Sequence, residues 1–149
     1  MSDTDCAICE KHRGRGPLAG PLVWTTGTVL VTHQPAGPDG LGVLGYLLVE
    51  PRRHVATWDL MTEQEVGSVA EAAWLSARAL RRLLDADGVF TAIVGRRIAH
   101  VHQHVFVRHA GTPDDIAWDD SPMWTGAPRG TPVEIEEFAE RVTAAIEDE

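Results

Sequence analysis

The segment that most constrains the fold of this chain is a run of alternating histidines, His100, His102 and His104, separated by Val101 and Gln103. Side chains on a β-strand point alternately to its two faces, so this pattern predicts a strand with three imidazoles on one face, about 6.6 Å apart. Each imidazole brings a hydrogen-bond donor and an acceptor that need partners. Three imidazoles in a row bring no advantage in packing, so the pattern indicates a catalytic or binding site.

The rest of the chain predicts an α+β fold built on a five-stranded antiparallel sheet. The histidine segment, residues 100–107, is expected to be the last strand, and apolar, β-branched runs predict four more at residues 22–25, 28–33, 45–50 and 89–94. A capping box at Thr62 begins a long amphipathic helix that is expected to end near Asp87 and Gly88. A second capping box at Thr131 begins a C-terminal helix over residues 132–147.

The length of 149 residues and a hydrophobic content of 44% predict a single domain over residues 1–149 with a real core. Residues 110–131 are expected to be irregular, and a connection this long is usually functional or disordered. It contains Trp118 and Trp124, which are suited to stacking on a base, covering the sheet or lining a dimer interface.

The net charge of −9 argues against binding of long nucleic acids, which need a basic surface, but not against a small anionic ligand. No apolar run approaches the roughly 20 residues that span a membrane. The polar stretch at residues 1–5 lacks the apolar core of a signal peptide, so we expect a cytoplasmic protein.

The histidine row alone leaves three interpretations open: solvated or core side chains, a zinc site held by two of the imidazoles, and phosphoryl chemistry at a neutral imidazole. Cys6 and Cys9 add a pair whose two-residue spacer is common among metal ligands and tight for a disulfide.

The histidine segment, followed by Val105 and Phe106, resembles the signature of the histidine triad (HIT) superfamily. Residues 45–54 resemble the strand of that family that ends in proline, two basic residues and His54, and Cys6 with Cys9 resembles its N-terminal cysteine pair. The resemblance covers about residues 6–108. It implies a HIT-like fold with one long central helix and a C-terminal helix, and a nucleotide hydrolase or transferase that is a homodimer.

The resemblance also implies roles for individual residues. His102 would attack the α-phosphorus of a nucleoside phosphate, a phosphoramidate or a dinucleoside polyphosphate, and form a nucleotidyl-histidine intermediate, while His104 would bind phosphate oxygens. A structural zinc ion would be held by Cys6, Cys9, His54 and His100, with His12 as a competing ligand.

Two departures from the family pattern affect substrate binding. Arg96 and Arg97 stand where a glycine-glutamine-serine type of turn is usual, and guanidinium groups suit a more anionic substrate. Gln34 stands where an acidic residue usually contacts ribose. The altered turn leaves open a non-catalytic nucleotide-binding or scaffold protein. The spacing of the histidines leaves open a zinc-dependent hydrolase with its metal on the triad.

Overall fold

The computed structural model describes residues 5–149; residues 1–4, part of the stretch predicted to lack a signal peptide, lie outside it. The helices and strands follow in the order α1 (Ala7–His12), β1 (Leu22–Thr25), β2 (Val29–His33), β3 (Gly42–Val43), β4 (Tyr46–Pro51), η2 (Trp58–Leu60), α2 (Glu63–Leu83), β5 (Ala86–Ile93), β6 (Gln103–His109), η3 (Trp118–Met123), β7 (Arg129–Gly130) and α3 (Pro132–Glu147).

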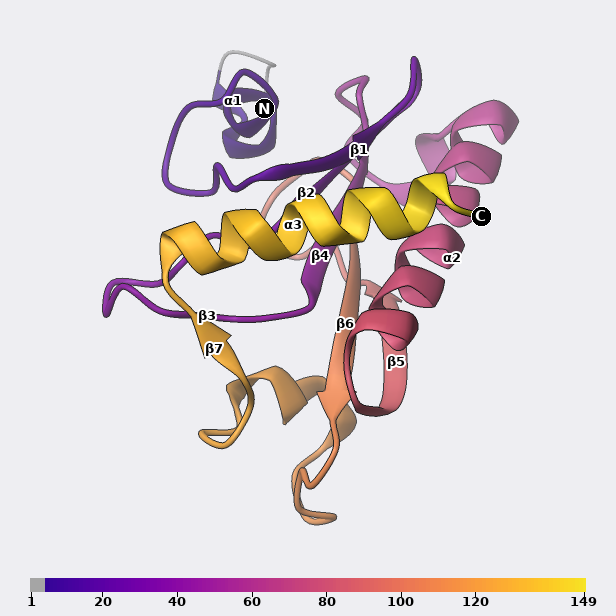
Figure 1. Ribbon diagram of the computed structural model, residues 1–149. Coiled ribbons are helices and arrows are strands. Elements are labelled where there is room, and N and C mark those ends of the chain that lie inside the picture. The colour runs from indigo at the N-terminus through magenta and orange to yellow at the C-terminus, as the bar shows by residue number, and fades with distance from the viewer. Residues whose placement is uncertain (1–4) are drawn as a thin grey trace.

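The predicted five-stranded antiparallel sheet is confirmed. Its strand order is β1-β2-β4-β6-β5, and every neighbouring pair is antiparallel. The helices α2 and α3 cover one face of it (Figure 1). The core lies between these two helices and the sheet. Strands β4 and β6 contribute the fully buried residues Leu47, Val49 and Val105 to it. Because side chains alternate along a strand, the other face of β4 and β6 is left for the histidine site.

Both capping boxes form as predicted. Thr62 Oγ1 accepts a hydrogen bond from the Glu65 amide at 3.2 Å, and the Glu65 carboxylate accepts one from the Thr62 amide at 2.9 Å. Thr131 and Glu134 repeat this exchange at the start of α3. Each exchange satisfies two amide groups at the helix start, which explains why both helices begin where the sequence predicts.

The predicted end of the long helix near Asp87 and Gly88 is wrong. The helix stops at Leu83, Leu84 is extended, and β5 begins at Ala86. Gly88 lies inside β5, where the register with β6 shifts between Ala86 and Gly88. The glycine therefore marks a bulge in a strand and not the end of a helix.

The predicted strand over residues 100–107 begins later than expected. β6 starts at Gln103, so His100 and His102 precede it and the three imidazoles do not form one row on a strand. The Val101 amide instead donates to the Val55 carbonyl at 2.9 Å, and the His100 side chain is fully buried. The segment before β6 therefore bonds to the backbone at Val55 and does not continue the strand.

The segment expected to be irregular, residues 110–131, contains the short helix η3 and the two-residue strand β7, which pairs with β3. Trp118 of η3 stacks on Phe106 of β6, with ring centroids 6.0 Å apart and planes 13° apart. This tryptophan therefore covers the sheet. No helix among residues 5–149 is long and apolar enough to span a membrane.

The buried His33 on β2 gives stability a pH dependence. Its Nδ1 donates to the Gln34 carbonyl at 2.7 Å and its Nε2 accepts from the Gly45 amide at 3.1 Å, so the neutral ring is fully satisfied. Burial lowers the pKa of His33 below its ordinary value. The unfolded chain takes up a proton near pH 6.5 and the folded chain only at lower pH.

We therefore expect the free energy of unfolding to fall as pH drops below about 6.5, with His33 contributing up to about 1.4 kcal/mol per pH unit. Urea unfolding between pH 7.5 and pH 5 measures the slope. His33→Gln, which still donates and accepts, is expected to be less stable at neutral pH but to show a shallower slope. Equal slopes for the two proteins would contradict this assignment.

Candidate functional site

The face of the sheet opposite α2 and α3 carries the candidate site. His104 on β6 lies opposite Leu48 on β4 in the strand register. His102, just before β6, places its ring centroid 5.1 Å from that of His104. Both side chains are partly exposed, whereas Val105 beside them is fully buried in the core. Two of the three histidines therefore share one accessible site.

A backbone contact fixes the chemical form of His102. Its Nδ1 lies 2.7 Å from the His100 carbonyl oxygen, which only accepts hydrogen bonds. The proton of the neutral ring therefore sits on Nδ1, and Nε2 keeps its lone pair. A neutral imidazole in this tautomer offers Nε2 as a nucleophile.

His104 is held by a residue that the sequence analysis missed. The Tyr46 hydroxyl lies 2.8 Å from His104 Nδ1, and the Tyr46 ring stacks on Phe106 with centroids 5.4 Å apart. Burial lowers the pKa of His104, and the neighbouring His102 lowers it further, which favours the neutral ring. The alternation of Tyr46 with buried Leu47 already places it on the site face, but only the fold brings it to His104.

His100 points away from the other two histidines, toward a separate cluster with Cys6, Cys9 and His54. His100 Nδ1 lies 3.6 Å from Cys6 Sγ and 3.5 Å from Cys9 Sγ, and His54 Nδ1 lies 3.4 Å from Cys9 Sγ. The four ligand atoms all lie within 4.8 Å of one another, and no other such group of three or more occurs among the described residues.

The geometry of this cluster fits a tetrahedral zinc ion. Zinc–sulfur bonds of about 2.3 Å and zinc–nitrogen bonds of about 2.0 Å place sulfur and nitrogen ligands about 3.5 Å apart. His100 Nε2 donates to the Pro51 carbonyl at 2.9 Å, which leaves the lone pair of Nδ1 for a metal. Burial also lowers the pKa of His100, and the neutral ring is the form that binds metal.

His12, the competing ligand of the sequence analysis, is engaged elsewhere. Its Nε2 lies 2.7 Å from Glu50 Oε2, and Lys11 Nζ donates to Glu50 Oε1 at 2.5 Å. Burial raises the pKa of Glu50, but hydrogen bonds and charge from His12 and Lys11 lower it by more, so the carboxylate stays ionised. Glu50 and Lys11 are buried charges beside the site that sequence analysis did not single out.

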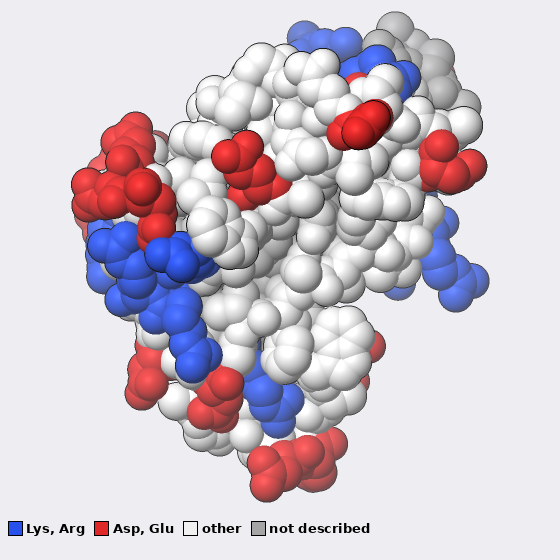
Figure 2. All heavy atoms as spheres, turned by 90° about the vertical axis from the view of Figure 1, so that its right-hand side faces the viewer, with Lys and Arg blue, Asp and Glu red and all other residues white. Residues whose placement is uncertain are grey.

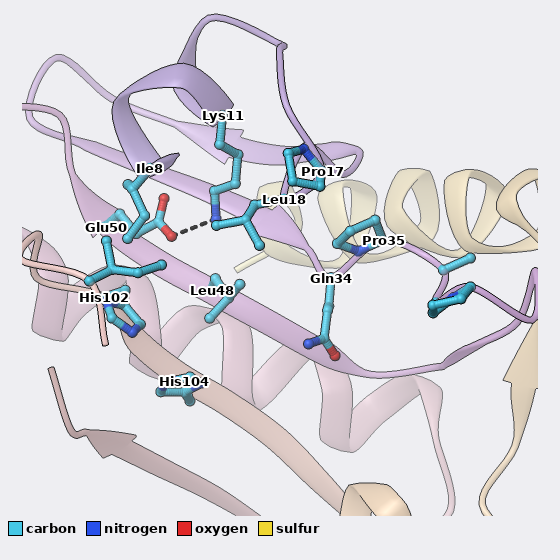
Figure 3. A pocket seen from close by; sticks show the side chains of 14 residues that line it. Ile8, Lys11, Pro17, Leu18, Gln34, Pro35, Leu48, Glu50, His102 and His104 are labelled. Atoms are coloured by element: carbon cyan, nitrogen blue, oxygen red, sulfur yellow. Dashed lines mark hydrogen bonds and ion pairs between the residues drawn. The ribbon is translucent and has the colours of Figure 1, made fainter. Parts of the chain in front are cut away.

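Two cavities meet at His102 and His104. The first, of about 550 Å³, is mainly apolar and extends past Leu48 to the Lys11–Glu50 pair, with Gln34 on its wall (Figure 3). The second, of about 680 Å³, is more polar. Arg96 and Arg97 line only the second cavity. The predicted substrate residues are thus divided between two cavities that share the histidine pair.

The two basic residues that precede His54 lie outside both cavities. Arg53 forms a two-pronged ion pair with Glu65 of α2, at 2.7 and 2.8 Å, and this contact lowers the pKa of Glu65 to about 2. Arg52 donates to Thr25 and Thr26 of the neighbouring hairpin. These arginines tie β4 to its neighbours.

Comparison with known proteins agrees with this geometry. The HIT domain model matches residues 42–111, which include His100, His102 and His104. No curated protein gives a significant match. A zinc-bound histidine triad family protein from Mycobacterium smegmatis has a similar structure, with 23% identity and a TM-score of 0.71 over 99% of this chain and 96% of that chain.

Two other solved structures show the same architecture. A hypothetical histidine triad nucleotide-binding protein from Sulfolobus tokodaii is 19% identical, with a TM-score of 0.68 over 92% of this chain and 88% of that chain. A diadenosine triphosphate hydrolase from Plasmodium falciparum is 15% identical, with a TM-score of 0.62 over 86% and 77% of the two chains. These structures show that the fold is HIT-like, and with the domain match they support the HIT superfamily.

Proposed function

We propose that this protein is a histidine triad enzyme that acts on the α-phosphate of a nucleoside phosphate, with His102 as the nucleophile. The observation that carries the proposal is the bond from His102 Nδ1 to the His100 carbonyl, which leaves the Nε2 lone pair available between two cavities. The HIT domain match and the similar nucleotide-binding and diadenosine triphosphate hydrolase structures support a nucleotide-related function.

The proposed reaction has two steps. His102 Nε2 attacks the α-phosphorus, a P–N bond forms, and the bond to the leaving group breaks as that group departs with the electron pair and takes up a proton. Water then attacks the same phosphorus, the P–N bond breaks, and nucleoside monophosphate and free His102 are released. Division of one difficult displacement into two easier ones is the gain from covalent catalysis.

The other groups bind substrate in this proposal. His104, which Tyr46 holds at 2.8 Å, contacts phosphate oxygens from the position beside His102. Gln34 lies on the wall of the apolar cavity, where its amide is able to bond a ribose hydroxyl. The volume of about 550 Å³ is in the range of small-ligand sites and suits the nucleoside.

Trapping the intermediate tests the proposal. Incubation with a nucleoside phosphoramidate or a dinucleoside polyphosphate, followed by a rapid quench, is expected to give a nucleotidyl adduct on His102, detected by mass spectrometry. His102→Ala is expected to lose at least ~10³-fold in turnover because it removes the nucleophile.

Gln103→Ala is the matched control, because Gln103 is adjacent in sequence but bonds to Thr91 and lines neither cavity. It is expected to keep both the adduct and the turnover. Nucleotide binding without adduct or turnover across the panel would favour the non-catalytic binding protein. Bound zinc that depends on His102 but not on Cys6 would favour a hydrolase with metal on the triad.

We further propose that Arg96 and Arg97 bind an anionic leaving group. They line the polar cavity, which shares His102 and His104 with the apolar cavity. With the nucleoside in the apolar cavity, the group beyond the α-phosphate would lie in the polar one. Guanidinium groups bind phosphate oxygens through paired hydrogen bonds. A polyphosphate leaving group therefore fits this cavity better than an uncharged amine.

The double variant Arg96→Gln/Arg97→Gln tests this assignment. The kcat/KM for a dinucleoside polyphosphate is expected to fall about tenfold or more, which is about 1.4 kcal/mol in transition-state binding, while kcat/KM for a phosphoramidate changes little. Arg52→Gln, which removes an arginine outside both cavities, is the control. Equal losses for both substrates would show that the arginines do not contact the leaving group.

We also propose that Cys6, Cys9, His54 and His100 hold a structural zinc ion. The zinc-bound Mycobacterium smegmatis relative and the ligand spacing of the cluster support this assignment. Four protein ligands leave no open position for substrate, so the metal would fasten α1 to the end of β4 and take no part in the reaction.

Metal analysis of the purified protein tests the zinc site. We expect about one zinc per chain, loss of most of it in Cys9→Ser, and a lower midpoint of thermal unfolding in that variant because a closed zinc site contributes to folding. His12→Gln, next to the cluster but bonded to Glu50, is expected to keep the metal. Full zinc content in Cys9→Ser would refute the assignment.

The homodimer and the cytoplasmic location stay predictions. β5 is an edge strand of the sheet, and Trp74 on the neighbouring α2 is 57% exposed. An edge strand beside an exposed tryptophan suits a contact with a second copy of the chain. Figure 2 shows this face, where basic side chains gather beside acidic ones. On α2, Arg78 and Arg82 pair with Glu149 at 2.8 and 3.1 Å.

A further inference from the structure

We infer that Lys11, held by Glu50, selects nucleotides whose base presents an oxo group rather than an amino group to the inner end of the apolar cavity. The inference rests on the proposed nucleotide function and goes beyond it by naming the class of base. It assigns Lys11 as a specificity-determining residue. The candidate bases are hypoxanthine, guanine and uracil, as against adenine and cytosine.

The position of Lys11 is the first argument. The same cavity is lined by His102 and His104 and, farther along, by Lys11 and Glu50, so it joins the proposed reacting centre to the ion pair (Figure 3). Ile8, one turn before Lys11 on α1, lines the same cavity. A nucleoside whose phosphate lies at the histidines would place its base among the apolar side chains toward this end.

The hydrogen-bond inventory is the second argument. An ammonium group has three donors and no acceptor. The Lys11 side chain is only 2% exposed, and among the described residues Glu50 is its one hydrogen-bond acceptor. Each Glu50 oxygen already has one partner, Lys11 or His12, so the carboxylate keeps only second lone pairs. The ammonium keeps N–H donors with no partner among the described residues, and an unpaired buried donor is rarer and costlier than a half-used acceptor. The polar end of the cavity therefore offers donors and calls for an acceptor on the ligand.

The cost of burying the pair is the third argument. Removing two charges from water is expensive, and an apolar pair of similar volume is often as stable or more stable. The surrounding wall is apolar. It includes Leu18 and also Leu48, which precedes Glu50 on the same face of β4. A buried charge with spare donors beside a ligand cavity is thus better explained by recognition than by stability.

The chemistry of the bases then gives the preference. The oxo oxygen of hypoxanthine, guanine or uracil accepts a charge-assisted hydrogen bond from the ammonium group. The exocyclic amino group of adenine or cytosine presents hydrogens to that ammonium, so one donor meets another. A site built to bond one group discriminates strongly against a ligand that leaves its buried donor unpaired.

Equilibrium binding of two matched pairs of nucleoside monophosphates tests the inference. Inosine and adenosine monophosphates differ in the oxo and amino groups of the purine, and uridine and cytidine monophosphates differ likewise in the pyrimidine. In the wild-type protein we expect the oxo member of each pair to bind at least about tenfold more tightly. In Lys11→Met we expect each ratio to fall below about threefold, through weaker binding of the oxo member.

Two further variants keep the test interpretable. Lys11→Met/Glu50→Leu removes both charges, so it avoids an incompletely paired buried carboxylate, and it is expected to show the same loss of preference while remaining folded. Arg13→Met removes a positive charge two residues along, outside the cavity, and is expected to keep the wild-type ratios.

The outcomes separate this inference from the proposed function. Wild-type ratios near one, a preference for the amino bases, or a preserved oxo preference in a folded Lys11 variant would each overturn the role of Lys11 and leave the His102 proposal standing. Failure of all four nucleotides to bind the wild-type protein would overturn the nucleotide function itself, and with it the inference.

Discussion

The hydrogen bond between His102 Nδ1 and the His100 carbonyl is the interaction on which the site depends. His100 is fixed on three sides: its Nε2 bonds the Pro51 carbonyl, its Nδ1 faces the cysteine sulfurs, and its ring is fully buried. Because His100 is held in this way, its backbone carbonyl offers His102 an acceptor at a fixed position. The tautomer of His102 is therefore set by the same contacts that join α1 to the end of β4.

The sequence predicted the parts of the fold that local chemistry determines. The capping boxes at Thr62 and Thr131 marked both helix starts, because the side chains that satisfy the terminal amides lie within four residues of one another. Gly88 was misassigned because a glycine signals either a helix end or a strand bulge, and the pairing with β6 decides between them. Local patterns do not contain that pairing.

For the candidate site, too, local sequence patterns predicted only part of the structure. The alternation of the histidines predicted three rings on one strand face, whereas the fold buries His100 and leaves His102 and His104 partly accessible. Only the family resemblance set His100 apart from the other two, as a metal ligand. Tyr46, Lys11 and Glu50 escaped notice because each is ordinary in its own segment. Tyr46 contacts His104, which lies 58 residues away in the sequence, and Lys11 contacts Glu50, which lies 39 residues away. No short-range pattern encodes such contacts.

One short helix connects the two sites. Cys6 and Cys9 lie at and just after the start of α1, and Lys11 lies two residues farther on, where its side chain lines the apolar cavity. Six residues form too short a helix to be stable alone, so its position must come from contacts outside it. The cysteine cluster on one side and Glu50 on the other supply those contacts. The residues that would hold the metal therefore also position the residue that would read the base.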